Sequence, residues 1–191
     1  MSTHAAAYPL DAAVPDLVDR LARGDGDAVA EAYDLHHESV RAFATKLLGD
    51  AAAAEDLVHD VFVSLPRVIR GYRRRSSLRT FLIGVAVNRA RHHVRAAARR
   101  RRATDRLATL PRPDVEDPES RVQRAQLAAA LAVALDRLPL RQRIAFVLCV
   151  MEERTSVEAA EIVGVSEGTI RSRLLYAKRK LRAALESEGV R

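Results

Sequence analysis

Apolar residues recur at intervals of three and four positions along most of the chain, which is the spacing of one face of an α-helix. The pattern predicts a short helix over 16–23 and longer helices over 28–48 and 51–65. The Gly-Asp pair at 49–50 separates the longer helices, because glycine suits the left-handed residue that ends a helix and aspartate can cap the next one. Pro66 is expected to end the third helix, since the residue before a proline is pushed out of the helical region.

A basic amphipathic helix is predicted from Leu78 to about Arg99. Its arginines alternate with apolar residues, so one side can be buried while the other is cationic. Ser76 or Ser77 can cap its start. Residues 103–120 then hold three prolines and five acidic residues with no sustained periodicity. Such a composition is typical of a flexible linker that divides a chain in two.

The chain after the linker is expected to be wholly helical. A helix over 121–137 is followed by a break at 138–139 and by a further apolar stripe from Leu140 to Met151. With no Trp, four Phe and four Tyr, the composition favours aliphatic packing between helices. The predicted fold is therefore all-α.

The most specific local pattern is a helix-turn-helix over residues 155–185. Thr155 and Glu158 have the spacing of a capping box that opens a short helix. Gly164 suits the residue that ends this helix, and Ser166 can cap a second helix that runs to about Leu185. In a helix-turn-helix protein the second helix lies in the major groove of DNA.

These patterns predict two small helical domains joined by a flexible linker, the C-terminal one a helix-turn-helix domain. The expected divisions are an N-terminal arm and short helix over 1–27, a first domain over 28–102, the linker over 103–120 and a second domain over 121–191.

Charge is sorted along the chain. The net charge of the whole protein is +7, but residues 1–66 hold four basic and twelve acidic residues, a net charge of −8. Residues 67–102 hold thirteen arginines and no acid, and residues 121–191 hold thirteen basic and eight acidic residues. Blocks of like charge stay solvated unless a partner neutralises them, so this distribution indicates a polyanionic partner.

Two segments have the chemistry of nucleic-acid binding. Tyr72 lies among three arginines in the loop before the basic helix, and such rings and guanidinium groups stack on unpaired bases while cations follow the phosphates. The predicted helix from Ser166 to Leu185 has one narrow apolar stripe and six cations elsewhere on its surface. Arginines there can read guanine through paired hydrogen bonds. A solvated basic face would also explain the charges, but DNA explains them better.

Other classes of protein find little support. One cysteine, Cys149, excludes a disulfide framework and fits a reducing cytoplasm. No apolar run is long enough to span a membrane, and the first fifteen residues do not resemble a secretion signal. His36 and His37 lack further ligands at a metal-binding spacing. With no phosphate loop and no nucleophile beside a base, we expect no enzymatic activity, no cofactor and no metal.

The chain resembles the extracytoplasmic-function (ECF) sigma factors of bacterial RNA polymerase. The resemblance covers about residues 28–185 and rests on segments similar to the second and fourth conserved regions of that family. These segments are Ala54–Phe62, Ser77–Leu82, Ala86–Arg91, Leu138-Pro139 with Arg143, and Glu158–Leu174. The family usually has tryptophan at two places where this chain has Leu65-Pro66 and Phe81.

The resemblance implies a cytoplasmic factor that binds core RNA polymerase and directs it to promoter DNA, often under control of an anti-sigma factor. Docking on the polymerase is assigned to Glu55, Asp56, Val58, His59, Asp60 and Phe62. Binding of the −10 element as a single strand is assigned to Tyr72, Arg73, Phe81, Asn88, Arg89, His92 and Arg95. Reading of the −35 duplex is assigned to Ser166, Thr169, Arg171, Ser172, Arg173, Leu175, Tyr176 and Arg179.

The alternative is a dimeric helix-turn-helix repressor or activator that binds duplex DNA without core polymerase. It accounts for residues 155–185 but gives the aromatic and arginine-bearing helix of the first domain no task.

Overall fold

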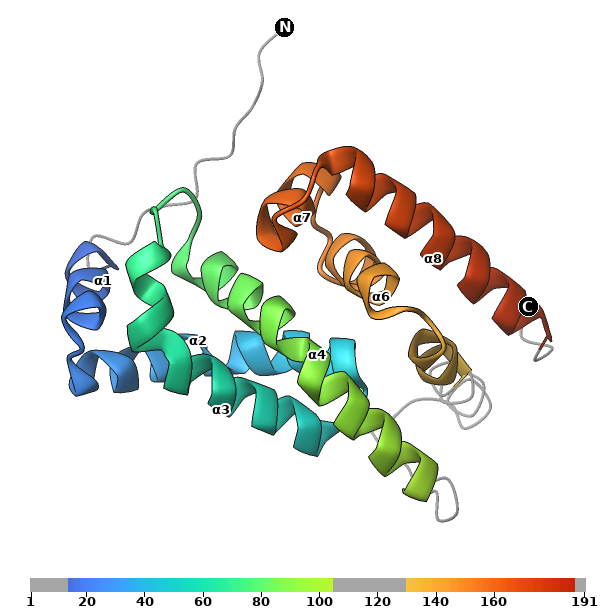
Figure 1. Ribbon diagram of the computed structural model, residues 1–191, viewed down its shortest axis with the longest axis horizontal. Helices are drawn as coiled ribbons and strands as arrows, with labels where there is room; N and C mark the ends of the chain where they lie inside the picture. Colours follow the sequence, from blue (N-terminus) through green and yellow to red (C-terminus); the bar gives the residue numbers. More distant parts are fainter. Residues whose placement is uncertain (1–13, 105–129, 188–191) are drawn as a thin grey trace, which may run out of the picture.

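The computed structural model describes residues 14–104 and 130–187, which form two groups of helices (Figure 1). No β-strand occurs among these residues. The elements of the first group are α1 (Val14–Arg23), α2 (Gly26–Leu48), α3 (Ala51–Val68), the 3₁₀ turn η1 (Ile69–Gly71) and α4 (Leu78–Thr104). Those of the second are α6 (Leu140–Phe146), the π-helical turn η2 (Val147–Met151), α7 (Ser156–Val163) and α8 (Glu167–Ser187). A helical stretch over 130–136 precedes α6. The predicted all-α fold is confirmed.

The helix ends follow the capping residues of the sequence. Gly49 ends α2 with φ of 61°, and its N–H donates to the Thr45 carbonyl at 2.8 Å. The Asp50 carboxylate then accepts from the N–H of Ala53 at 2.6 Å and caps α3. Gly24, with φ of 82°, closes α1. Because these residues satisfy the free backbone groups of the helix termini, the turns between α1, α2 and α3 are short.

The prediction that Pro66 ends the third helix is wrong. Helix α3 continues through Pro66 to Val68, and the N–H of Ile69 still donates to the Leu65 carbonyl. Proline removes only its own N–H from the helix, so the residues after it keep their bonds. Leu65 and Ile69 are 0% and 2% exposed. Their burial holds the last turn in helical conformation against the local preference of the residue before a proline.

The core of the first domain lies between α2, α3 and α4. Phe43, Leu47, Leu57, Val61 and Leu82 are all buried there. The same cluster of buried residues continues into the second domain, where Ile144, Val147, Leu148, Ala159 and Ile170 belong to it. A smaller cluster joins the stretch before α6 to α8 through Leu135, Leu138, Ala177 and Leu181.

The two helical domains therefore pack directly against each other, with α7 on α4 and η2 on α2. Figure 1 shows α6 and α7 beside α4, and α8 on the far side of them. The predicted linker over 103–120 lies almost wholly outside the described residues. The composition of the linker predicted two separate domains, and nothing in the sequence predicted that α7 and η2 would pack on α4 and α2.

Candidate nucleic-acid and polymerase interfaces

The turn that positions α8 is built as the sequence predicts. Thr155 Oγ1 accepts from the N–H of Glu158 at 3.2 Å, and Glu158 Oε2 accepts from the N–H of Thr155 at 2.8 Å. The hydrogen bond from the backbone N–H of Thr155 lowers the pKa of the Glu158 carboxyl. Gly164 has φ of 72°, and Ser166 Oγ accepts from the N–H of Thr169 at 3.3 Å. The capping box, the left-handed glycine and the serine cap are thus confirmed, and together they fix the angle at which α8 leaves the turn.

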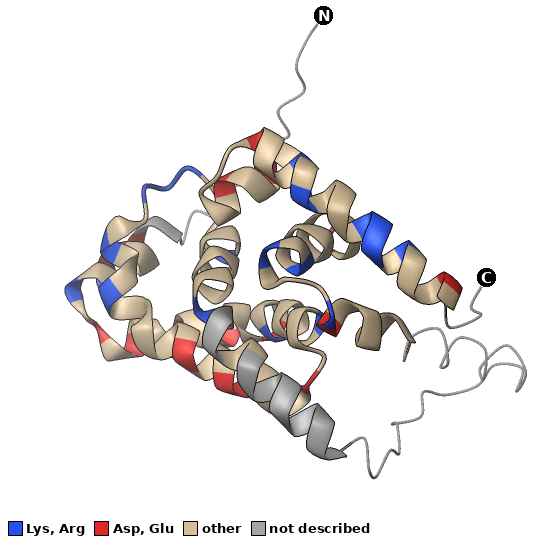
Figure 2. Cartoon of the chain, turned by 45° about the vertical axis from the view of Figure 1, so that its right-hand side comes forward, with Lys and Arg blue, Asp and Glu red and all other residues tan. Residues whose placement is uncertain are grey.

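One side of α8 is buried and the other faces outward. Ile170, Ala177 and Leu181 lie against the protein with 0%, 0% and 4% exposure. The exposed positions carry cations and two large side chains, Leu175 and Tyr176, which are 57% and 53% exposed. Figure 2 shows basic residues gathered on α8 and on the loop before α4. An exposed helix of this composition can enter a DNA groove without rearrangement of the domain.

The eight residues predicted to read duplex DNA have different surroundings. Arg171, Ser172, Leu175, Tyr176 and Arg179 are exposed. Ser166 and Thr169 join their hydroxyl groups at 2.8 Å and hold the first turn, while Arg173 is half-buried. Arg171 Nη2 lies 2.5 Å from Glu167 Oε1, but such an exposed pair is weak and can exchange for a phosphate.

The loop before α4 is held in place by its own contacts. The ring of Tyr72 packs against Phe81 with centroids 4.9 Å apart, and its hydroxyl donates to the Ser76 carbonyl. Burial raises the pKa of the Tyr72 hydroxyl, although the charge of Arg74 opposes this. Arg74 adopts φ of 54° and pairs with Asp19 of α1 at 2.5 Å. Tyr72 therefore shapes the loop and is only half-exposed to a base.

The remaining candidates for the single strand lie along α4. Asn88 is exposed, Arg89 and Phe81 are half-buried, and Arg73 is exposed on the loop. The side chains of His92 and Arg95 lie outside the part of the chain that the structure describes in detail. Ser77 caps α4, since its Oγ accepts from the N–H of Thr80 at 3.2 Å. A cavity of about 440 Å³ lies beside this helix, with Thr80, Phe81 and Asn88 on one side and Glu161 and Ile162 of α7 on the other.

The candidate docking face on α3 is partly corrected. Glu55, Asp56 and His59 are exposed, as predicted for contact with a partner. Val58 and Phe62, however, are only 1% and 4% exposed and belong to the core, so they are withdrawn from this surface. Both α2 and α4 pack on α3, so its buried side is wide enough to include Val58 and Phe62.

Three features of this face were missing from the sequence prediction. Val63 is 65% exposed on α3, one helical turn beyond His59 and Asp60. Because Val63 lies off the apolar stripe of α3, the helical periodicity of the sequence could have identified it as an exposed apolar residue. Asp60 Oδ2 lies 2.8 Å from Nε2 of His93, which ties α3 to α4. Glu55 pairs with Arg41 of α2 at 2.6 Å. The face is thus acidic at its rim and carries one exposed valine, and an open cleft of about 670 Å³ lies beside it.

Cys149 is half-buried and forms no disulfide among the described residues. Burial raises the pKa of the Cys149 thiol, which disfavours the reactive thiolate. Among the described residues no group of His, Cys, Asp and Glu has the arrangement of a metal site. No helix in the described part of the chain has the length and apolar character to cross a membrane.

Comparison with known families identifies the class of protein. Residues 32–100 match the family model for sigma-70 region 2, and residues 128–181 match that for sigma-70 region 4. The chain is 32% identical to the ECF RNA polymerase sigma factor SigL of Mycobacterium tuberculosis over 181 residues, 89% of this chain and 99% of SigL. It is 27% identical to the RNA polymerase sigma-H factor of Pseudomonas aeruginosa over 182 residues, 89% of this chain and 92% of that factor.

Solved structures share the fold. CnrH, in complex with the cytosolic domain of CnrY, superposes with a TM-score of 0.61 at 21% identity, and the match covers 90% of this chain and 96% of CnrH. The sigma factor RpoE of Bartonella quintana, in complex with the anti-sigma factor NepR, gives a TM-score of 0.58 at 24% identity, and the match covers 82% of this chain and 96% of RpoE.

The chain belongs to the ECF sigma factors of RNA polymerase, the proteins that direct the polymerase to promoters. The match of the first domain to region 2 removes the alternative of a plain helix-turn-helix regulator.

Proposed function

We propose that three separate surfaces of this sigma factor divide the work of initiation. Helix α8 reads the −35 element as duplex DNA, the loop before α4 and α4 itself hold the −10 element as a single strand, and the exposed face of α3 docks on core polymerase. The observation that carries the proposal is the outward face of α8. Its exposed cations and Tyr176 project from a helix whose opposite side, formed by Ile170, Ala177 and Leu181, is buried, so they are not needed for packing.

The assignment on α4 rests on Asn88. Its side chain is exposed on a helix whose neighbouring positions Val85, Ala86 and Val87 are buried. An amide can form hydrogen bonds with a base edge, and stacking on nearby rings or guanidinium groups contributes about 1–3 kcal/mol per base.

We assign residues 28–102 to the region 2 domain and residues 121–191 to the region 4 domain.

Partners follow from the same chemistry. The acidic rim of α3 with exposed Val63 suits a basic protein surface with an apolar contact, and we assign it to core polymerase. Because two structures of the same fold hold their sigma factors in complex with other proteins, we further propose control by an anti-sigma factor. The factor works where the polymerase is, in the cytoplasm, and has no catalytic activity of its own.

Reconstituted transcription tests the division between α8 and α4. Arg171→Ala and Asn88→Ala should each lower transcription from a duplex promoter, for a base-reading contact is worth about 1–3 kcal/mol. Asn88→Ala should recover on a template whose −10 region is mismatched and already open, whereas Arg171→Ala should not recover. Arg182→Ala, an exposed cation near the end of α8, is the matched control. Full activity of both variants on the closed template would refute the assignments.

A further inference from the structure

Helix α1 is packed into the first domain although it precedes the segment that matches sigma-70 region 2, residues 32–100. Leu17 and Leu21 are 2% and 0% exposed and belong to the same buried cluster as the residues of α2, α3 and α4. Arg20 of α1 also pairs with Glu31 of α2 at 2.7 Å. Apolar burial and this ion pair fix the position of α1 on the domain.

Helix α1 lies where the loop before α4 begins. It contacts the end of α3 and the turn η1, and η1 leads directly into the loop Tyr72–Ser77 (Figure 1). Ile69 of η1 is 2% exposed, and its carbonyl accepts from the N–H of Tyr72 at 2.9 Å. The loop therefore starts from a buried turn on which α1 packs.

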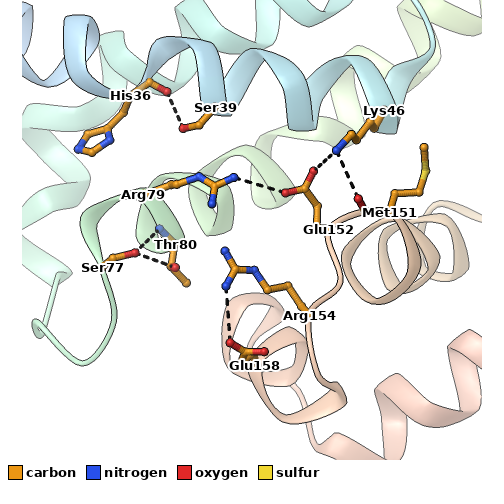
Figure 3. Close-up of polar contacts among 10 residues, drawn as sticks. All are labelled: His36, Ser39, Lys46, Ser77, Arg79, Thr80, Met151, Glu152, Arg154 and Glu158. Carbon is orange, nitrogen blue, oxygen red and sulfur yellow. Dashed lines mark hydrogen bonds and ion pairs between the residues drawn. The ribbon is translucent and has the colours of Figure 1, made fainter. Parts of the chain in front are cut away.

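Both ends of the loop are held by contacts that do not involve its arginines. At the start, the ring of Tyr72 packs against Phe81 and its hydroxyl donates to the Ser76 carbonyl. At the end, Ser77 Oγ accepts from the N–H of Thr80 at 3.2 Å and lies 2.9 Å from Thr80 Oγ1 (Figure 3). What holds the middle of the loop must be sought elsewhere.

The middle of the loop is tied to α1 through Arg74. Its φ of 54° lies in the left-handed region, which is uncommon for a residue other than glycine and persists only where the surroundings favour it. Asp19 Oδ1 of α1 lies 2.5 Å from Arg74 Nη2. Arg73 and Arg75, on either side, are exposed. One of three adjacent arginines thus contacts the protein, and its neighbours face solvent.

The strength of this ion pair suits a role in the loop and not in the fold. The side chains of Arg74 and Asp19 are 45% and 56% exposed, and exposed ion pairs contribute little to the stability of a domain. The cost of one left-handed residue is of similar size. The pair can therefore select one conformation of the loop without being needed for folding.

We propose that α1 is a brace for the loop Tyr72–Ser77 and that Asp19 is a positioning residue for the −10 element. Acting through Arg74, Asp19 holds the loop so that Arg73 and Tyr72 are already arranged when an unpaired base binds. A prearranged loop loses less freedom on binding and so discriminates better between bases. The brace rests on the proposed function of the loop and adds to it a residue that contacts no DNA.

Two changes test the pair without disturbing the buried side of α1. Asp19→Asn keeps the size of the side chain and removes its charge. Its matched control is Asp16→Asn, at an exposed acid of the same helix, which changes the net charge equally. The second change reverses the pair, with Asp19→Arg and Arg74→Asp made singly and together. Aspartate tolerates the left-handed conformation, so the reversed pair can keep the backbone of the loop.

The assay is transcription by core polymerase reconstituted with the full-length chain. The template carries a promoter whose start site depends on the wild-type chain, and derived templates change single bases of its −10 or its −35 element. The ratio of transcripts from the original and the changed template measures discrimination. Thermal melts followed by circular dichroism establish that each variant keeps the stability of the wild-type chain.

We expect Asp19→Asn to lower discrimination at the −10 element about threefold, equivalent to about 0.7 kcal/mol. Discrimination at the −35 element should not change, because α8 has no contact with this loop in the proposed division of work. Asp16→Asn should match the wild-type chain at both elements. The reversed pair should recover most of the −10 discrimination that Asp19→Arg and Arg74→Asp each lose.

Three results would overturn the brace. The first is a −10 discrimination for Asp19→Asn equal to that of Asp16→Asn. The second is an equal loss at the −10 and −35 elements, which indicates a general effect on the protein. The third is a reversed pair that recovers nothing, since Asp19 would then not act through Arg74.

Arg73→Ala separates these results from a failure of the proposed function. If Arg73→Ala lowers −10 discrimination and Asp19→Asn does not, the loop binds the −10 element and only the brace is wrong. If Arg73→Ala leaves −10 discrimination unchanged, the proposed function of the loop fails and the brace fails with it.

Discussion

Replacing Arg143 by methionine should destabilise the protein, because it removes a buried charge that connects the two domains. The substitution keeps the apolar volume of the side chain and removes its charge. Asp136, whose side chain is 23% exposed, then loses the cation 2.9 Å away. The Leu47 carbonyl loses a donor at 3.3 Å.

The size of the effect follows from burial. Breaking a fully buried ion pair costs about 3–5 kcal/mol, and a hydrogen bond to a charged group is worth about 1.5–3 kcal/mol. Because Asp136 keeps part of its hydration and the Leu47 bond is long, values at the low end apply. We expect a loss of about 3 kcal/mol in the free energy of unfolding, by reference to those ranges.

Urea unfolding followed by circular dichroism measures this loss. Arg141→Met is the matched control, since Arg141 lies on the same helix and is exposed, and it should change the free energy of unfolding by less than about 0.5 kcal/mol. Adding Asp136→Leu to Arg143→Met should recover part of the loss, because the carboxylate that has lost Arg143 is then replaced by an apolar side chain. A cost below about 1 kcal/mol for Arg143→Met would refute the reasoning, as that is the worth of an ordinary hydrogen bond.

Three further predictions concern docking, pH and the helix-turn-helix. Val63→Arg should abolish co-purification with core polymerase, whereas Val157→Arg, at another exposed valine on α7, should not; retained association of Val63→Arg would remove α3 as the docking site. Burial, with the charge of Arg79 adding to it, lowers the pKa of His36, so the unfolded chain binds a proton more readily and stability should fall as pH drops below about 6.5. His36→Gln should flatten that dependence in thermal melts, and an unchanged slope would contradict the assignment. Gly164→Ala, at φ of 72°, should lower the free energy of unfolding by about 1 kcal/mol, whereas Gly168→Ala in α8 should raise it; equal effects would exclude a role for the left-handed conformation.

Local structure could be predicted from the sequence because its causes are local. Gly49, Asp50, Gly164 and the Thr155–Glu158 capping box act on backbone groups within one turn of themselves, and all four are confirmed. Pro66 misled the prediction because the burial of Leu65 and Ile69, which depends on other helices, outweighs the local preference.

The surfaces were harder to predict. Val58 and Phe62 were assigned to docking from the family resemblance, whereas both are buried where α2 and α4 pack on α3. The contact between the domains depends on residues about a hundred positions apart, such as Lys46 with Glu152 and Arg143 with Leu47. Helical periodicity and capping patterns do not predict such pairs. Glu152 directly follows an apolar run, and from the sequence alone an acidic residue in this position is expected at the solvated surface.

In vitro transcription from a pool of genomic DNA tests the central claim most directly. Core polymerase is incubated with the pool in the presence and absence of the purified chain, and the 5′ ends of the transcripts are sequenced. The account predicts a set of start sites that appears only with the chain, preceded by shared −35 and −10 sequences, and that is lost with Arg171→Ala. A folded chain that adds no start sites to those of core polymerase alone would contradict it.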